Sequence, residues 1–252
     1  GQMGVDYDVD LAVIGSGGAA MSAAIAASQA GKSVVLVERG VLGGTCVNIG
    51  CVPSKTLLAA AGARHAALTN PFKGAPTSAA PVNLGDLVAQ KDALIERLRD
   101  AKYADVAAAY GFQVRPGQAS FLDGDTLAVD GQALRARAYL VATGATPAIP
   151  EVVGLDSVDR LTSTTAMQLT ELPESLVVIG GGYVGMEQAQ LFAHLGTRVS
   201  VVGRLAPHAE PELAQRLREV FTDDGITVVE ERATTVAREP GPAGEVVVTT
   251  AS

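Results

Sequence analysis

The stretch Gly43–Lys55 reads GGTCVNIGCVPSK and contains both cysteines of the 252-residue chain, Cys46 and Cys51. On an ideal helix, positions five apart have Cα atoms roughly 8–9 Å apart, whereas a disulfide needs about 4.4–6.8 Å. The two cysteines can therefore form a disulfide only if the helix is distorted between them. Gly50, directly before Cys51, permits that distortion because glycine adopts backbone conformations that other residues avoid.

Three kinds of site use two cysteines at this spacing. A structural zinc site takes four nitrogen or sulfur ligands, and the nearest histidine in sequence, His65, lies fourteen residues beyond Cys51. A structural disulfide needs an oxidising compartment, and residues 1–10 have neither the basic start nor the apolar run of a signal peptide. The third kind is a redox pair whose thiolate is favoured by a helix N-terminus and by Lys55. The sequence favours the redox pair.

The composition excludes several classes of partner. Asp and Glu outnumber Lys and Arg by 27 to 19, which gives a net charge of −8. Nucleic acids and anionic membranes bind clustered cations, so we expect neither as a partner. No apolar run approaches the length of about 18 residues that a membrane span requires. We expect a cytoplasmic protein. Because 48% of the residues are hydrophobic, we also expect a full hydrophobic core.

A dinucleotide-binding fingerprint lies near the start of the chain. The apolar run at 8–14 predicts a buried parallel strand, Gly15-x-Gly17-x-x-Ala20 follows it, and a helix is expected to about Ala30. The next strand, Val34–Val37, ends at the acid Glu38, which would bind a ribose hydroxyl. The residues expected to contact this nucleotide are Gly15, Gly17, Gly18, Ala19, Ala20, Glu38, Arg39 and Gly40.

The middle of the chain predicts two helices and then short strands. We expect helices over Cys46 to about Ala67 and over Leu84 to about Tyr110, with a surface loop at Asn70–Pro81. Short strands should fill Phe112–Tyr139. Their turns are Asp123-Gly124 and Asp130-Gly131, both favourable in hairpins.

A second fingerprint repeats the pattern. The strand Leu176–Ile179 leads into Gly180-x-Gly182-x-x-Gly185, a helix to about Leu195 and a strand at Arg198–Val202. The position 23 residues after the first glycine is Glu38 in the first fingerprint and Gly203 in the second. The acid of the first fingerprint is therefore replaced by glycine in the second, and Arg204 follows that glycine. An arginine there suits a 2′-phosphate, which predicts NADPH. Beyond it we expect a helix from Pro211 to about Asp223 and strands at 226–229 and 245–249.

Together these motifs resemble the pyridine nucleotide-disulfide oxidoreductases, a family of flavoproteins. Gly-Gly-Thr-Cys-x4-Cys-x-Pro is similar to their redox-active signature. Val47 and Val52 resemble the glutathione and mercuric reductases of the family, Ser54-Lys55 differs from glutathione reductase, and the segment Gly15–Met21 resembles mercuric reductase. The resemblance covers residues 8–252 and about half of a family member.

The resemblance implies an α/β fold with two Rossmann-like dinucleotide-binding domains, for FAD and then NADPH. Each would have a parallel sheet and a small antiparallel β-meander. Residues 1–153 would form the first segment of the FAD domain. Residues 154–252 would form the NADPH domain, incomplete at its C-terminal side.

The resemblance also implies roles for individual residues. Cys51 would face the flavin, and Cys46 would be the interchange thiol that faces substrate. Lys55 would lie near the flavin and pair with Glu187, while Tyr103 would line the substrate site. Further FAD contacts would come from Gly44, Thr45, Lys55, Ala119, Thr143 and Gly144. The NADPH contacts would be Gly180, Gly182, Tyr183, Val184, Gly185, Glu187, Gly203 and Arg204, with Tyr183 covering the nicotinamide pocket.

The implied activity is the NADPH-driven reduction of Hg(II) to Hg(0), with Cys46 and Cys51 holding the metal ion as substrate. One alternative is a reductase of dihydrolipoamide or another small thiol or disulfide. Another is a nucleotide-binding fragment without activity, and we expect the chain alone to be inactive. The family implies a homodimer for the full-length enzyme. The histidines His65, His194 and His208 are expected to be surface or structural residues.

Overall fold

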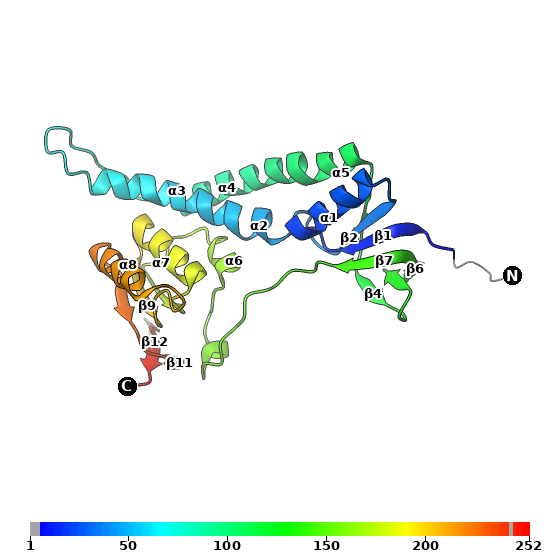
Figure 1. The fold of residues 1–252 in the computed structure, drawn as a ribbon. Helices are drawn as coiled ribbons and strands as arrows, with labels where there is room; N and C mark the ends of the chain where they lie inside the picture. Colours follow the sequence, from blue (N-terminus) through cyan, green and yellow to red (C-terminus); the bar gives the residue numbers. More distant parts are fainter. Residues whose placement is uncertain (1–5, 242–243) are drawn as a thin grey trace. The chain divides into compact units, whose positions relative to one another are not determined.

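The computed structural model describes residues 6–241 and 244–252 and has a mixed α/β fold (Figure 1). Its contacts divide the chain into two compact units. The first contains the chain up to Pro53 together with Asp92–Thr146, and the second contains Ser54–Lys91 together with the chain from Pro147 onward. The assignment of one nucleotide to 1–153 and another to 154–252 stays a prediction.

A four-stranded parallel sheet is the centre of the first unit. Its strands lie in the order β3 (Gln113–Pro116), β2 (Val34–Glu38), β1 (Val9–Ile14) and β7 (Ala136–Val141). In the register, Val13 is paired with Leu36 on one side and with Leu140 on the other. Because parallel strands are covered on both faces, they read as continuous apolar runs, and β1 and β2 do so.

The two faces of this sheet have different covers. Val13 and Leu36 pack with α1 (Gly18–Gln29) and α5 (Asp105–Tyr110) on one face. Ala12 and Val35 pack on the other face with β5 (Leu127–Val129) and β6 (Gln132–Leu134). These two strands and β4 (Ala119–Phe121) form an antiparallel sheet. The unit is therefore a three-layer sandwich of helices, parallel sheet and β-meander.

The predicted hairpins are confirmed. Asp130 and Gly131 form the two-residue connection between β5 and β6, with φ of 48° and 80°. Positive φ at both central positions is the backbone that such a tight hairpin requires. The segment with Asp123-Gly124 connects β4 to β5, which are also antiparallel.

The expected single helix from Cys46 to Ala67 is wrong. A short helix, α2 (Gly44–Asn48), ends at Ile49, and α3 (Cys51–Leu68) begins at the second cysteine. Ile49 has φ −137° and ψ 2°, which is not helical. A Cβ on Gly50 would lie 3.0 Å from the Thr45 carbonyl oxygen, so a side chain would be crowded there. The backbone between the cysteines thus leaves the helical conformation at Ile49.

The expected helix over Leu84–Tyr110 has the predicted length, but it is not an α-helix throughout. It consists of α4 (Leu84–Arg99), a π-helical turn η1 (Asp100–Ala104) and α5. π-helical turns insert one extra residue into an α-helix and occur frequently at functional sites. Here the turn carries Lys102 and Tyr103.

The second unit repeats the strand–helix–strand pattern. Its parallel sheet has the order β10 (Thr227–Val229), β9 (Arg198–Val202), β8 (Ser175–Ile179), which matches β3-β2-β1. The helix α7 (Tyr183–Leu195) joins β8 to β9, and α8 (Pro211–Asp223) precedes β10. In the part of the chain that the structure describes, β8 has β9 as its only neighbour, whereas β1 has two. The smaller elements are η2 (Leu155–Ser157), α6 (Ser163–Ala166), β11 (Ala233–Arg238) and β12 (Val246–Thr250).

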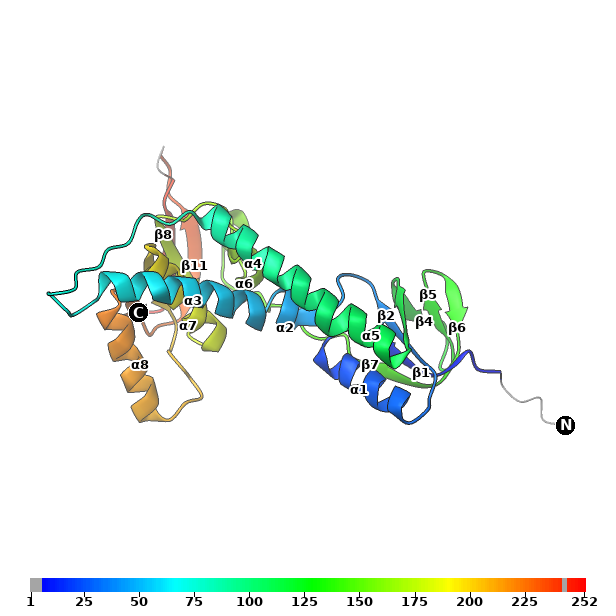
Figure 2. The same cartoon turned by 90° about the horizontal axis from the view of Figure 1, so that it is seen from above.

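The core of the second unit includes helices from the middle of the chain. Leu57 of α3 and Leu84 and Val88 of α4 belong to the same buried cluster as Ala189 and Phe192 of α7. Figure 2 shows the amino-terminal part of α4 beside α3, joined through the exposed segment that follows Leu68. Within the described ranges, no helix combines the length and apolar character that a membrane crossing needs.

Candidate nucleotide and redox site

Three sequence-distant glycine segments meet at the carboxyl end of the first sheet. Gly15 has φ +112°, and a Cβ on it would lie 2.1 Å from the Ala142 carbonyl oxygen. Gly44 has φ +68°, and a Cβ on it would lie 2.5 Å from the Cα of Gly17. The fingerprint, the redox segment and the Ala142-Thr143-Gly144 turn therefore pack backbone against backbone. Only glycine permits these approaches, and such bare backbone is what a pyrophosphate needs nearby.

The first helix of this site presents its amino end to the same region. Gly17 is the N-cap residue of α1 and provides no side-chain cap. The helix dipole and the first amide groups favour an anion at such an end. Thr45 also faces this region, because its hydroxyl oxygen lies 4.0 Å from the Cβ position of Gly144. The residues present fit an FAD pyrophosphate on these observations.

Glu38 is held in place by its neighbours. The Ser16 hydroxyl donates to one oxygen of the Glu38 carboxylate, and the Gly40 amide donates to the other at 2.7 Å. The Ser16 oxygen also accepts from the Gly43 amide at 3.0 Å. A carboxylate has about four acceptor positions, so Glu38 retains acceptor capacity for a ribose hydroxyl. Ser16 couples the fingerprint to the redox segment, a role that the sequence did not indicate.

The two cysteines are exposed thiols at the junction of α2 and α3. The hydrogen bond between the Cys46 thiol and Cys51 is the largest influence that raises the pKa of Cys46, and burial adds to it. The positive charge of Lys102 opposes this effect. The Cys46 thiol therefore needs a higher pH to ionise than an isolated thiol does, and Cys51 is the first residue of α3.

The π-helical turn places two side chains at the cysteine pair. Burial raises the pKa of Tyr103, and the charge of Cys46 raises it further, so the phenol stays neutral. A Cβ on Gly43 would lie 3.3 Å from the Tyr103 ring. The predicted substrate-site tyrosine thus lies beside Cys46. Lys102, its neighbour in sequence, was not among the predicted site residues.

A second contact that the sequence did not indicate holds α2 in place. Arg99, the last residue of α4, donates to the Asn48 side-chain oxygen from Nε at 3.0 Å and from a terminal nitrogen at 2.8 Å. The Asn48 amide group donates in turn to the carbonyl oxygens of Leu42 and Gly44. This bidentate contact holds the redox helix to the turn that carries Tyr103.

The second fingerprint has the same construction within the second unit. A Cβ on Gly185 would lie 2.1 Å from the Gly180 carbonyl oxygen, and one on Gly181 would lie 2.3 Å from the Arg204 carbonyl oxygen. Gly182 is the N-cap residue of α7 and provides no side-chain cap. The close strand–helix approach and the open helix end fit a second dinucleotide.

Arg204 stands at the end of β9 and is exposed. Gly203 before it has φ +135°, and its Cβ position is 3.3 Å from the Cα of Gly180. Glu230 accepts from the Leu205 amide at 3.2 Å and from Arg218 at 3.3 Å. The Glu230 carboxylate therefore accepts hydrogen bonds from Leu205 and Arg218 beside the segment that holds Arg204.

Lys55 and Glu187 form an ion pair inside the second unit, with 2.5 Å between the lysine Nζ and the glutamate Oε1. Lys55 lies in α3, and Glu187 lies in the first half of α7. The expected pairing is present, and its part in electron transfer stays a prediction.

Comparison with known proteins agrees with this geometry. The family model described as pyridine nucleotide-disulphide oxidoreductase matches residues 9–252.

The chain belongs to this family.

The chain is 53% identical over 227 residues to a mercuric reductase of Streptomyces lividans, covering 87% of this chain and 48% of that protein. It is 47% identical to a mercuric reductase of Staphylococcus aureus, covering 89% and 42%. Among solved structures, the HOCl-induced flavoprotein disulfide reductase RclA of Escherichia coli matches with a TM-score of 0.81 and 26% identity, over 96% of this chain and 53% of that chain. The chain thus spans about half the length of these relatives. Mercuric reductases and flavoprotein disulfide reductases are FAD-containing, NADPH-dependent enzymes.

The other predicted nucleotide contacts are mostly exposed side chains. Ala119 begins β4 and packs partly buried against the β-meander core. Tyr183 and Val184 open α7 and are 67% and 60% exposed. Arg39 and Thr143 are exposed as well. Their roles toward FAD and NADPH stay predictions.

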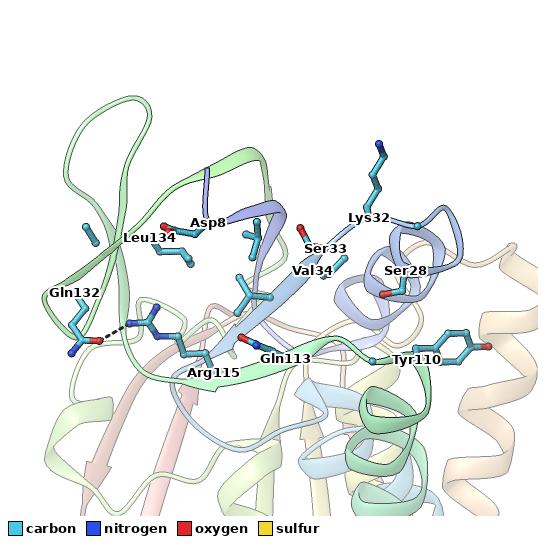
Figure 3. Close-up of a pocket in the computed structure, with 15 residues that line it drawn as sticks. Asp8, Ser28, Lys32, Ser33, Val34, Tyr110, Gln113, Arg115, Gln132 and Leu134 are labelled. Carbon is cyan, nitrogen blue, oxygen red and sulfur yellow. Dashed lines mark hydrogen bonds between the residues drawn. The ribbon is translucent and has the colours of Figure 1, made fainter. Parts of the chain in front are cut away.

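A polar hollow in the first unit lies away from the nucleotide site. Figure 3 shows Lys32, Ser33, Gln113 and Arg115 around it, with Arg115 bonded to Gln132 at 2.9 Å. These residues stand at the amino ends of β2 and β3 or within β3. The fingerprint stands at the carboxyl ends, where ligands of parallel α/β sheets bind. We therefore place the cofactor at the fingerprint and not in the hollow.

Proposed function

We propose that this chain carries the redox-cysteine and nucleotide-binding part of a flavoprotein that uses NADPH to reduce Hg(II) to Hg(0). The observation that carries the proposal is the exposed Cys46–Cys51 pair beside Tyr103, in a chain 53% identical to a mercuric reductase. Two thiolates bind a soft divalent ion far better than oxygen ligands do.

Bound FAD would supply the two-electron link between NADPH and the cysteine side of the site. In the proposed reaction Cys46 and Cys51 bind Hg(II) as thiolates, so both thiol protons leave on binding. Two electrons convert Hg(II) to Hg(0), and both sulfurs are released to take up protons again. Lys102 stabilises the thiolate of Cys46 by its charge, and neutral Tyr103 closes one side of the substrate position.

Two cysteine variants test the assigned roles in the full-length enzyme. Cys46→Ser should remove the outer ligand but keep the long-wavelength absorbance that a Cys51 thiolate gives beside oxidised FAD. Cys51→Ser should abolish that absorbance, and both variants should lose Hg(II)-dependent NADPH oxidation. Identical flavin spectra in the two variants, or retained Hg(II) reduction in either, would refute the roles.

A disulfide reductase is the second candidate, because the solved structure that matches at TM-score 0.81 is a flavoprotein disulfide reductase. Parallel assays with Hg(II), with lipoamide and with a small disulfide separate the two. NADPH oxidation that depends on a disulfide and not on Hg(II) would replace our proposal with this one. Nucleotide binding without turnover of any substrate would favour the inert alternative.

A further inference from the structure

A cluster of two histidines and one aspartate lies in the second unit, apart from the residues assigned to the redox reaction. His65 comes from α3, His194 from the last turn of α7, and Asp224 from the residue that ends α8. One possible ligand atom from each residue lies within 4.8 Å of the others. The sequence did not indicate the cluster because its members are far apart along the chain.

The carboxylate of Asp224 faces the Nε2 atoms of both imidazoles. Its Oδ2 is 2.9 Å from Nε2 of His194, and its Oδ1 is 3.5 Å from Nε2 of His65. The two rings are stacked, with centroids 3.8 Å apart and an angle of 8° between their planes. Two nitrogen donors and one anionic oxygen donor therefore lie within one small volume.

The cluster is pre-organised by contacts around it. Gln190, one turn before His194, donates to Asp224 Oδ2 at 3.0 Å, the kind of outer contact that orients a metal-binding carboxylate. Arg64, the neighbour of His65, donates to the His194 carbonyl oxygen at 2.8 Å and joins α3 to the end of α7. The side chains of His194 and Asp224 are 12% and 10% exposed, whereas that of His65 is 33% exposed. The site is thus partly shielded but open to an ion on the His65 side.

We propose that His65, His194 and Asp224 form a binding site for one borderline divalent cation of the zinc class, with solvent as the fourth ligand. Imidazole and carboxylate are ligands that such ions accept, and three protein ligands with one open position are a common zinc arrangement. Bonds of about 2.0–2.2 Å in a tetrahedron separate ligand atoms by about 3.3–3.6 Å. The 3.5 Å between Asp224 Oδ1 and His65 Nε2 already lies in this range, whereas the 2.9 Å between Asp224 Oδ2 and His194 Nε2 has to widen slightly.

Binding should break the histidine stack. The lone pairs of two parallel rings do not converge on a shared ion, so one ring has to tilt. His65 is the more exposed of the two and is the ring that moves. The ion would then connect α3, α7 and the end of α8, which stabilises the folded unit by mass action.

The test uses the full-length protein with Cys46→Ser and Cys51→Ser, so that these thiols do not bind the metal. Zn²⁺ affinity is measured by competition with a chromophoric chelator, and Co²⁺ binding by its visible absorption. His65→Gln, His194→Gln and Asp224→Asn are compared with His208→Ala, which changes an exposed histidine outside the cluster. Each cluster variant should bind Zn²⁺ at least about tenfold more weakly than the parent, as losses at metal ligands or their supports do. His208→Ala should match the parent.

His65→Gln is the decisive variant if the more buried changes disturb folding. It should retain the circular dichroism of the parent and lose the rise in Tm that Zn²⁺ produces. Unchanged Zn²⁺ affinity in His65→Gln and His194→Gln, or no Zn²⁺-dependent rise in Tm in the parent, would overturn the site. Neither result depends on mercury reduction, so the outcome is independent of the proposed function.

Discussion

Two charged residues, Lys102 and Arg204, lie where they could affect the proposed reaction without taking part in it. The proton on Cys46 is held by the hydrogen bond with Cys51, and Lys102 acts in the opposite direction by stabilising the thiolate. The exposed Arg204 follows a glycine where the first fingerprint has an acid. Each of these charges can be removed without touching a sulfur or a fingerprint glycine.

Lys102→Ala should raise the pKa of Cys46, because it removes a cation that lowers that pKa. The thiolate is the reactive form, so alkylation of Cys46 should need a higher pH. The measurement is the pH dependence of iodoacetamide labelling at Cys46 by peptide mass spectrometry, in a Cys51→Ser background. Lys32→Ala removes a charge elsewhere in the same unit and should leave the profile unchanged. An unshifted profile in Lys102→Ala would remove Lys102 from the site.

Arg204→Ala should lower kcat/KM for NADPH by about tenfold to a hundredfold in the full-length enzyme. A hydrogen bond to a charged group contributes about 1.5–3 kcal/mol, and the 2′-phosphate would lose this partner. The value for NADH should change little, since NADH has a hydroxyl in place of the phosphate. Arg198→Ala, at the opposite end of β9, is the control. Equal losses for both cofactors would count against the assignment.

At the scale of elements, the close contact between β8 and α7 depends on one missing side chain. Gly185→Ala would bring a Cβ to 2.1 Å from the Gly180 carbonyl oxygen. Since backbone has to move, we expect a loss of about 1–3 kcal/mol in the free energy of unfolding and weaker NADPH binding. Gly62→Ala, inside α3 with no atom near its Cβ position, should stabilise by up to about 1 kcal/mol. Denaturant unfolding of both variants checks the contrast, and equal effects would contradict it.

The repeating elements were predictable because their signals are local. The strand Arg198–Val202 and the helix Pro211–Asp223 match their predicted bounds. The strand is marked by its apolar residues and the helix by Pro211 at its start, and each signal lies within its own segment. The break at Ile49 and the π-helical turn at Asp100–Ala104 were missed. Both lie beside contacts between residues far apart in the sequence, such as the one between Asn48 and Arg99. The periodicity of a single segment carries no information about such contacts.

The residues of the candidate site could be predicted where they belong to a sequence motif. They could not be predicted where only the fold brings them together. The fingerprint glycines and the cysteine pair follow from spacing. Ser16, Lys102 and the histidine–aspartate cluster each reach their place through the fold. The strand β11 was also missed, because half of its residues are polar.

For the molecule as a whole, the order of segments in the chain differs from their order in the core. Leu57, Leu84 and Val88 precede residue 92 but belong to the cluster that contains Phe192. A chain cut after residue 153 should therefore expose their apolar side chains. We expect residues 1–153 to bind the dye ANS and to aggregate, while residues 1–252 do neither. Static light scattering and dye fluorescence check this, and a monomeric 1–153 that ignores the dye would contradict it.

The central position of β1 has a consequence for the protein on the ribosome. β1 needs β2 on one side and β7 on the other, and β7 begins at Ala136. At about 5–20 residues per second, the wait from Ile14 to Val141 is on the order of ten seconds. During that time one edge of β1 is open to other nascent chains. The face that carries Ala12 and Val35 stays uncovered until β5 and β6 are made. The first sheet is thus completed long after its first strand has been made.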